Sequence, residues 1–284
     1  MVPAPGIGVG YWAGAPSATA HDGLIYVAYR VRLPIGSGRG HGNVVARSTD
    51  GVRLDTVASL SKDRFGAESL ERPALVGTAD GTWRLYVSCA TPGTKHWRID
   101  VLEAARPDEL ASAVPRTVLP GDATYGIKDP VVLWHAGQWH LWASRHPLDD
   151  PLATDRMTTE YATSDDGLDW QWQGTALAPR PRTWDQRGVR VTAVLVGEEV
   201  STAFYDGRAT ADENYEERTG IADGPGLSEF VATELAPVAE SPHAGHGLRY
   251  ITAVTVGHDV RVYYEAARAD GAHELRTAIL GNDG

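Results

Sequence analysis

The sequence holds a single cysteine, Cys89, and only three phenylalanines among its 284 residues. One cysteine excludes an internal disulfide and a zinc site built from several thiolates. No run of about 18 apolar residues occurs, so a membrane-spanning helix is not expected. The sequence also has no excess of positive charge: its formal net charge is -11 and its pI is about 5.3. This excludes the basic surface that non-specific binding to nucleic acids or anionic membranes requires.

The first twelve residues, MVPAPGIGVGYW, contain no basic segment followed by an apolar stretch. They therefore give no sign of a signal peptide. A cytoplasmic location is the expectation, and removal of a signal ahead of this sequence would instead make the protein secreted.

Helical periodicity is nearly absent, and only Arg106–Ala113 predicts a helical turn. The chain instead contains pairs of runs that alternate apolar and polar residues, joined by short turns with glycine. Gly126–Pro147 is the clearest pair, and its alternation predicts a β-hairpin. The nine tryptophans and eleven tyrosines are also typical of strands.

The hairpin pattern occurs five times, in register at Pro16, Pro73, Pro130, Thr192 and Thr252. The intervals are 57, 57, 62 and 60 residues. After each hairpin come a variable loop, a third short strand and a weaker fourth one. Five such units predict an all-β fold, a five-bladed β-propeller with four antiparallel strands per blade, forming one domain over residues 1–284.

The last unit is one strand short, so Ile7–Trp12 is predicted to pair into the C-terminal blade and close the ring. An array of fibronectin-like sandwiches is the structural alternative. It would need units of about 100 residues, which is longer than those observed.

In a propeller the innermost strands line a central channel, so residues before each first strand and after each second strand converge at one face. These positions combine carboxylates, arginines and aromatic residues, which favours a ligand site. The candidates are Trp12, Glu71, Arg72, Lys128, Asp129, Arg190, Arg249 and Tyr250 at the entries, and Arg145, Asp206, Arg208 and Glu265 at the exits. Ion pairs between blades are the structural interpretation of the same residues.

The segment IKDPVVLWHAGQWHLWAS resembles the third-blade motif of the five-bladed glycosidases, which include glycoside hydrolase families 43, 32, 68, 62 and 130. The turns STDG and TSDDGLDW are similar to the S-x-D-x-G-x-x-W turns of many sugar-cleaving propellers. The resemblance implies a carbohydrate substrate. In family 43 an Asp before Pro in this blade tunes the catalytic acid, and Asp129 matches it. A Gly-His entry to the fifth blade lies near a bound cation, so His246 is implied as a neighbour of an ion such as calcium.

Two positions depart from that family. Its general base, an Asp at the first-blade entry, is replaced by Gly14-Ala15-Pro16, and its general acid, a Glu at the fourth-blade entry, by Gly188-Val189-Arg190. Because glycoside hydrolysis normally needs two carboxylates, Asp129 would have to act with Glu71 or Asp206.

The sequence thus predicts a glycosidase-like hydrolase whose catalytic carboxylates are Asp129, Glu71 and Asp206. The arginines near one face favour an anionic substrate such as a uronate or a phosphate. A carbohydrate-binding protein that has lost catalysis is the second hypothesis, and a lyase or phosphorylase acting on a sugar phosphate is the third. The expected partner is a small molecule or oligosaccharide, with no nucleic acid or membrane; the oligomeric state stays open. Substrate binding is assigned to Trp12, Arg72, Lys128, Arg145, Arg190, Arg208, Arg249, Tyr250 and Glu265.

Overall fold

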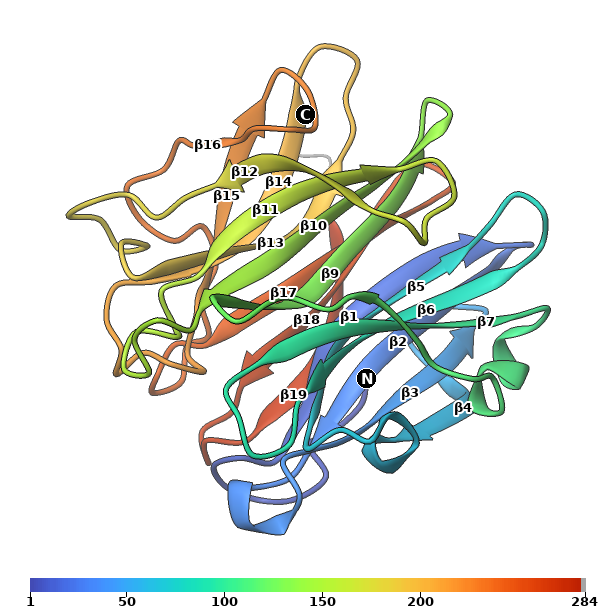
Figure 1. The fold of residues 1–284 in the computed structure, drawn as a ribbon, viewed down its shortest axis with the longest axis horizontal. Helices are drawn as coiled ribbons and strands as arrows, with labels where there is room; N and C mark the ends of the chain where they lie inside the picture. The colour runs from blue at the N-terminus through green and yellow to red at the C-terminus, as the bar shows by residue number, and fades with distance from the viewer. Residues whose placement is uncertain (282–284) are drawn as a thin grey trace.

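The computed structural model describes residues 1–281, and nearly all of its regular structure is β-strand (Figure 1). Three short 3-10 turns interrupt the strands: η1 (Ile35–Ser37), η2 (Lys62–Phe65) and η3 (Pro107–Ala111). The last lies inside the segment predicted to be helical. Among the described residues, no helix has the length and apolar character needed to cross a membrane.

Three sheets contain four antiparallel strands each, joined in chain order. The first has β5 (Leu70–Gly77), β6 (Trp83–Ala90), β7 (Trp97–Ala104) and β8 (Arg116–Leu119). The next has β9 (Tyr125–His135), β10 (Gln138–Pro147), β11 (Thr158–Ser164) and β12 (Gln171–Leu177). The third has β13 (Gly188–Leu195), β14 (Ser201–Arg208), β15 (Arg218–Gly224) and β16 (Val231–Ala232). Sheets of this kind are the units from which β-propellers are built.

The remaining strands form one seven-stranded sheet in the order β17-β18-β19-β1-β2-β3-β4. Its strands are β1 (Trp12–His21), β2 (Leu24–Arg32), β3 (Gly40–Ser48), β4 (Asp55–Ser61), β17 (Leu248–Val256), β18 (Asp259–Ala267) and β19 (His273–Leu280). The C-terminal strands β17–β19 and the N-terminal strands β1–β4 meet at one parallel residue pair, Trp12 of β1 with His273 of β19. The all-β prediction is confirmed, and the expected hairpins and third strands are present.

The N-terminal segment pairs with β19 at Tyr11 and Trp12, within the expected range Ile7–Trp12, and also at Val2, outside that range. Val2 forms an antiparallel bridge with Leu275, and the Tyr11 carbonyl accepts a hydrogen bond from the His273 amide. Ile7 and Val9 lie between these two contacts and are exposed. The segment is therefore fixed at its two ends instead of forming a continuous strand over Ile7–Trp12.

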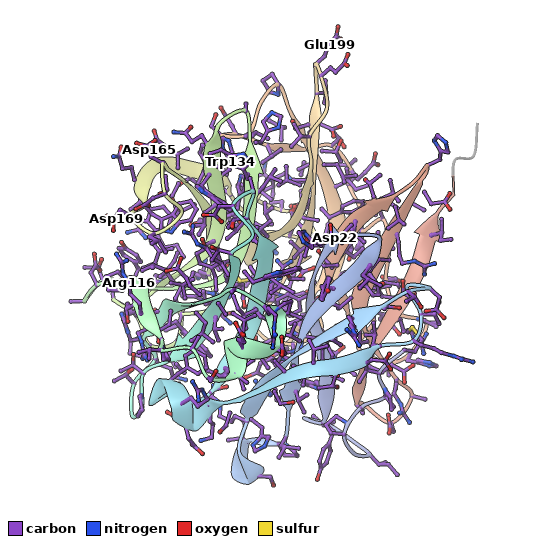
Figure 2. The ribbon with its side chains drawn as sticks, turned by 90° about the vertical axis from the view of Figure 1, so that its right-hand side faces the viewer. Asp22, Arg116, Trp134, Asp165, Asp169 and Glu199 are labelled. Atoms are coloured by element: carbon purple, nitrogen blue, oxygen red, sulfur yellow. The ribbon has the colours of Figure 1, made fainter. Side chains whose placement is uncertain are left out.

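Two turns are similar in sequence to turns of the glycosidase propellers, and an equivalent set of hydrogen bonds stabilises each of them. The Asp166 carboxylate accepts from the amides of Leu168 and Asp169 at 2.8 and 2.9 Å, and Ser164 Oγ accepts from the Gly167 amide. Asp50 and Ser48 repeat this arrangement between β3 and β4. Figure 2 shows Asp165 and Asp169 at the surface end of the first of these turns.

The first strand of every predicted unit shifts its hydrogen-bond register at the same place, next to the Pro or Thr used for alignment. The shifts lie between Gly14 and Ser17, between Leu70 and Pro73, opposite Trp142–Ser144, between Val191 and Ala193, and between Arg249 and Thr252. Such bulges take a residue out of strand pairing and turn its side chain. At three of them a non-glycine residue has a positive φ: Ala15, Asp129 and Tyr250.

Five apolar cores lie between neighbouring groups of strands. One packs Leu141 and Ile127 of β9–β10 against Tyr86, Ile99 and Val101 of β6–β7. The others join β2–β4 with β5–β7, β10–β12 with β13–β15, β13–β14 with β17–β18, and β17–β19 with β2–β3. The core is therefore divided into layers between sheets, and each layer depends on both of its sheets.

Replacing Leu141 by Ala tests such a layer. The side chain is fully buried, so the substitution leaves a cavity and should lower the free energy of unfolding by about 2–5 kcal/mol. Leu152→Ala is the matched control, because Leu152 is 87% exposed and its truncation should change stability by less than about 0.5 kcal/mol. Urea unfolding measures both. Equal midpoints for the two variants would contradict this packing.

Candidate functional site

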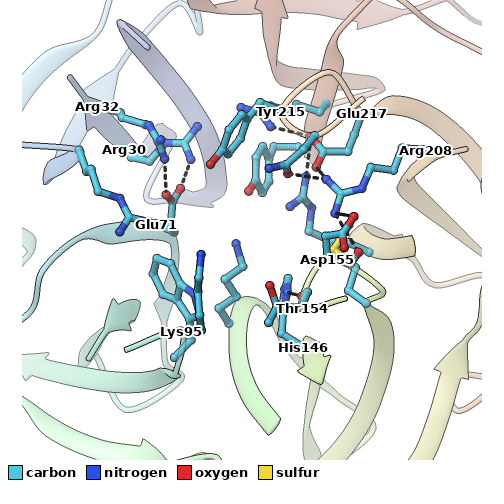
Figure 3. Close-up of a pocket in the computed structure, with 18 residues that line it drawn as sticks. Arg30, Arg32, Glu71, Lys95, His146, Thr154, Asp155, Arg208, Tyr215 and Glu217 are labelled. Atoms are coloured by element: carbon cyan, nitrogen blue, oxygen red, sulfur yellow. Dashed lines mark hydrogen bonds and ion pairs between the residues drawn. The ribbon is translucent and has the colours of Figure 1, made fainter. Parts of the chain in front are cut away.

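A pocket of about 150 Å³ lies where the bulged first strands begin (Figure 3). We call it the central pocket. Its lining is dominated by charged and aromatic side chains: Arg30, Arg32, Arg39, Glu71, Lys95, Trp97, Lys128, His146, Thr154, Asp155, Met157, Arg190, Arg208, Asn214, Tyr215, Glu217, Arg249 and Tyr250. The positive side chains among them outnumber the carboxylates by eight to three.

The fold brings these residues together as the hairpin pattern predicts. Lys128, Arg190 and Arg249 come from the starts of the first strands β9, β13 and β17, and His146 and Arg208 from the ends of the second strands β10 and β14. Antiparallel pairing places the end of a second strand beside the start of its first. Of the predicted site residues, six line the central pocket: Glu71, Lys128, Arg190, Arg208, Arg249 and Tyr250.

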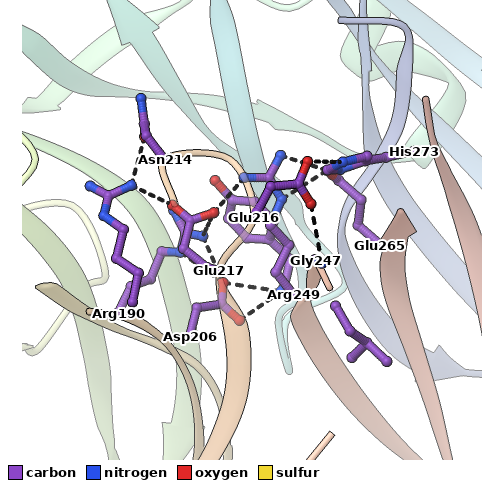
Figure 4. A network of polar contacts seen from close by, with 12 residues as sticks. Arg190, Asp206, Asn214, Glu216, Glu217, Gly247, Arg249, Glu265 and His273 are labelled. Carbon is purple, nitrogen blue, oxygen red and sulfur yellow. Dashed lines mark hydrogen bonds and ion pairs between the residues drawn. The ribbon is translucent and has the colours of Figure 1, made fainter. Parts of the chain in front are cut away.

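Glu217 is the centre of one half of the charge network (Figure 4). Its carboxylate accepts hydrogen bonds from Arg249 at 2.6 Å and Arg208 at 2.9 Å, and lies 3.7 Å from Arg190. Burial alone would raise the pKa of Glu217, but these three guanidinium groups hold it well below its ordinary value. Glu217 is therefore an ionised acceptor.

Asp129 and Asp206 share Arg190. Arg190 donates to Asp206 at 2.7 and 2.9 Å and to Asp129 at 3.2 Å, and the Tyr250 amide also donates to Asp206. Burial would raise the pKa of Asp129, but Lys128 and Arg190 lower it to about 2. Burial, with Glu217 nearby, raises the pKa of Asp206 to about 6 despite Arg190. Both carboxylates are completely buried and lie outside the lining of the central pocket.

Glu71 and Glu265 form the other half of the network. Glu71 accepts from Arg30 and from Arg32, and Arg30 also donates to Glu265 at 2.6 Å. Glu265 accepts in addition from Arg249, at 2.7 and 2.9 Å. A Cβ atom at Gly14 would collide with the Glu265 side chain. The first-blade entry thus has no carboxylate of its own, because one from β18 occupies that space.

The remaining predicted residues lie behind or beside the pocket. Trp12 is buried against Arg32, Tyr215 and His273. Arg72 is buried and donates to the carbonyls of Pro16 and Thr192. Glu265 is fully buried in the network. Arg145 is exposed and lies over Tyr125, because side chains alternate along β10 and its neighbour His146 takes the inward position.

His246 is also outside the lining of the central pocket. Its ring is exposed, and Nδ1 lies 3.2 Å from the Ser241 carbonyl and 3.7 Å from Glu240. Across residues 1–281, no three His, Cys, Asp or Glu side chains are grouped closely enough to hold a metal ion. The residues around His246 therefore do not fit the channel cation that the resemblance implied.

Several lining residues were not among the predicted ones: Lys95, Trp97, Thr154, Asp155, Asn214, Tyr215 and Glu217. Trp97 and Glu217 stand at the starts of third strands. Since a third strand runs antiparallel to the second, it begins at the face where the second ends, and that rule would have found them. The others belong to variable loops, which carry no repeat signal.

Five of the lining arginines are paired with buried carboxylates: Arg30, Arg32, Arg190, Arg208 and Arg249. The two lysines are less fully engaged. Lys95 is exposed and has no ion pair within the described part of the chain. Lys128 lies 3.5 Å from Asp129 and 4.8 Å from the centre of the Trp97 ring. Burial, reinforced by Arg190, lowers the pKa of Lys128 to about 8 despite Asp129. Lys128 can therefore exchange a proton near neutral pH.

Glu217→Gln tests whether the network stabilises the fold. The substitution leaves three buried guanidinium groups without their shared anion, and should reduce the free energy of unfolding by about 3–5 kcal/mol. Glu199→Gln is the matched control, because Glu199 is exposed at the tip of the β13–β14 hairpin. Urea unfolding of both variants at pH 7 provides the measurement. Unchanged stability of the Glu217 variant would contradict a structural role for this carboxylate.

No family model and no curated protein sequence matches the chain. Among solved structures, it is similar to a thermostable family-43 glycoside hydrolase, with a TM-score of 0.74 and 14% identity over 96% of this chain and 91% of the other. It is also similar to an α-L-arabinofuranosidase from Lactobacillus brevis, with a TM-score of 0.70, 16% identity, and 96% and 92% coverage.

A β-1,2-mannobiose phosphorylase from Listeria innocua has a TM-score of 0.70 and 12% identity, over 96% of this chain and 90% of the other. These likenesses extend over nearly the whole chain at low sequence identity. The protein therefore has the fold of the β-propeller glycosidases.

Proposed function

We propose that the protein acts on a carbohydrate in the central pocket, and that the bound species includes an anionic group, either a phosphate or a carboxylate. The observation that carries this proposal is the excess of positive charge. Six arginines and two lysines line the pocket, against the carboxylates of Glu71, Asp155 and Glu217. In a chain with a net charge of -11, such a concentration favours an anionic ligand.

The position of the anion follows from which lining cations have the fewest carboxylate partners. Arg190, Arg208 and Arg249 are bonded to buried carboxylates. Lys95 lies across the pocket from Arg208 and has no ion pair among the described residues (Figure 3). Lys128 lies 4.8 Å from the centre of the Trp97 ring and has one carboxylate partner, Asp129, at 3.5 Å. The chain has only three lysines, Lys62, Lys95 and Lys128, and two of them line this pocket. We therefore assign the anionic group to the Lys95–Lys128 side.

A sugar unit suits the rest of the lining. The rings of Trp97, Tyr215 and Tyr250 face the pocket together with hydrogen-bonding side chains. Aromatic faces with a few polar groups are typical of small-molecule sites. A volume of about 150 Å³ corresponds to about five water molecules, which is room for a single sugar ring. The similar solved structures are of proteins named as glycoside hydrolases and mannoside phosphorylases.

Phosphorolysis fits these groups better than hydrolysis by two carboxylates. Each of the three lining carboxylates is hydrogen-bonded to or ion-paired with an arginine. The pKa of Glu217 is lowered as well, so Glu217 is a poor proton donor. Phosphorolysis needs a bound phosphate as the second reactant, which the lysines would hold. Phosphate attacks the anomeric carbon, the glycosidic bond breaks, and the leaving oxygen takes a proton. Lys128 is our candidate for that proton donor.

Titration calorimetry tests the anion site directly. Inorganic phosphate and D-glucuronate should bind at low salt, and D-glucose should bind more weakly. Lys95→Gln should weaken binding of both anions about three- to tenfold, as expected for the loss of one partly exposed charge. Lys62→Gln is the matched control, since Lys62 lies outside the pocket lining. Absence of anion binding, or equal effects of the two variants, would overturn the proposal.

Assays of aryl glycosides and manno-oligosaccharides with and without phosphate distinguish phosphorolysis from hydrolysis. Phosphate-dependent cleavage that yields a sugar phosphate supports phosphorolysis, and equal cleavage without phosphate supports the hydrolase. Anion binding with no turnover of any glycoside leaves the carbohydrate-binding protein as the better alternative.

The pH dependence of binding gives a second prediction. Below its pKa of about 8 Lys128 is a cation, and it loses this charge as the pH rises. D-Glucuronate keeps a constant charge over this range, so its affinity should fall about three- to tenfold between pH 7 and pH 9. Lys128→Arg keeps the charge and should abolish the fall. Calorimetry at both pH values measures this, and an identical decline in both proteins would falsify the assignment.

We also propose that residues 1–284 form a single five-bladed domain around this pocket, with the N-terminal segment closing the last blade. The five cores between neighbouring groups of strands support this arrangement, as does the single residue pair that joins β19 to β1. A diffraction structure tests it, and any other number of sheets around the pocket would contradict it.

A further inference from the structure

His146 is a lining residue whose imidazole is oriented by the main chain. It lies near the end of β10, is buried, and faces the central pocket (Figure 3). Its Nδ1 atom is 2.8 Å from the carbonyl oxygen of Thr154. A carbonyl only accepts, so Nδ1 must carry the hydrogen. In the neutral ring, Nε2 is then left with a lone pair.

The surroundings keep this ring neutral. Burial, with the positive charge of Lys128, lowers the pKa of His146 to about 3, although Asp129 opposes the change. Nε2 is therefore an acceptor throughout the neutral range. It is buried and has no hydrogen-bond partner among the described residues.

An unpartnered acceptor is unusual in this pocket, whose other groups are mainly donors and engaged acceptors. The Asn214 side-chain oxygen, for example, already accepts from Arg208 at 2.6 Å. Leaving a buried acceptor unsatisfied costs about 1–3 kcal/mol, so a ligand that donates to it gains affinity. An ionised carboxylate has no hydrogen to donate, whereas a hydroxyl has.

We infer that Nε2 of His146 accepts a hydrogen bond from a ligand hydroxyl, so that the central pocket selects a hydroxylated organic anion, such as a sugar acid or sugar phosphate, over an organic anion that has no hydroxyl group. This inference rests on the proposed function and adds a specificity-determining residue to it. The anionic group lies at the lysines and the hydroxyl at His146.

The strand register sets the separation of the two groups. Lys128 of β9 pairs with Ser144 of β10, and His146 follows two residues further along β10. Two residues of a strand span about 7 Å. The two residues are thus offset by about 7 Å along the strands, and both lie at the same end of the β9–β10 hairpin.

The experiment compares D-glucuronate with cyclohexanecarboxylate, which has the same charge and ring size but no hydroxyl groups. In calorimetric titrations of the wild type and of His146→Phe, the ratio of the two affinities should shift about three- to tenfold against glucuronate in the variant. The affinity for cyclohexanecarboxylate should change less than about twofold. His258→Phe, at an exposed turn between β17 and β18, is the matched control and should leave the ratio unchanged.

The possible failures are distinguishable. If neither anion binds the wild type, the proposed function fails. If both bind and the ratio is the same in His146→Phe, the anion site stands and the role of His146 is overturned. Should the variant not fold, nitrogen NMR of the wild type decides. The Nε2 resonance of His146 should move on addition of glucuronate and stay unchanged with cyclohexanecarboxylate; equal behaviour with both would overturn the inference.

Discussion

The ion-pair network between Glu71, Glu265, Glu217 and the arginines around them is the interaction on which the rest of the centre depends. It connects side chains from β2, β5, β14, β17 and β18 and from the start of β15, which are far apart in the sequence. Burying charge is costly unless every ion is paired and hydrogen-bonded. The sheets must therefore meet in one arrangement, since any other would leave a guanidinium or a carboxylate unpaired.

The same network determines which chemistry the pocket favours. Carboxylates bonded to two or three guanidinium groups are fixed in the ionised state, so they cannot easily deliver a proton to a leaving group. What faces the pocket with freedom to bind or to exchange protons is a lysine pair, tyrosine rings and one neutral imidazole. The pocket of this glycosidase fold is thus lined mainly by cations, and its carboxylates are engaged by arginines.

Much of the fold could be predicted from the sequence, because its signals are local. Alternation, glycine-containing turns and the repeat spacing predict the hairpins, and short turns such as Ser164–Gly167 define their own geometry. The convergence of Glu71, Lys128, Arg190 and Arg249 also follows from strand order. The repeat pattern does not show how deeply each residue is buried. Asp129 and Asp206 were expected to act on substrate, but they are buried under Arg190, an arrangement set by contacts between different sheets.

Lys95, Tyr215 and Thr154 show a second limit. They lie in loops whose lengths differ from unit to unit, so no internal alignment can bring them into register. His146 follows Arg145 at the exit of β10, and only the observed alternation of side chains shows that His146 points inward and Arg145 outward. Which side chains face the pocket thus depends on the conformation of the loops and on which residues of each strand point inward. Both require the structure.

The bulge in each first strand has a further consequence for how such a protein can change over evolutionary time. A residue that takes no part in strand pairing can be replaced without altering the alignment of its neighbours. Replacing Ala15, Asp129 or Tyr250 therefore leaves the strand alignment unchanged, and its cost is set by the positive φ and the buried contacts of each position. This separates the residues that specify the scaffold from those that specify the ligand. It gives a physical reason why chains that share this fold can have so little sequence in common.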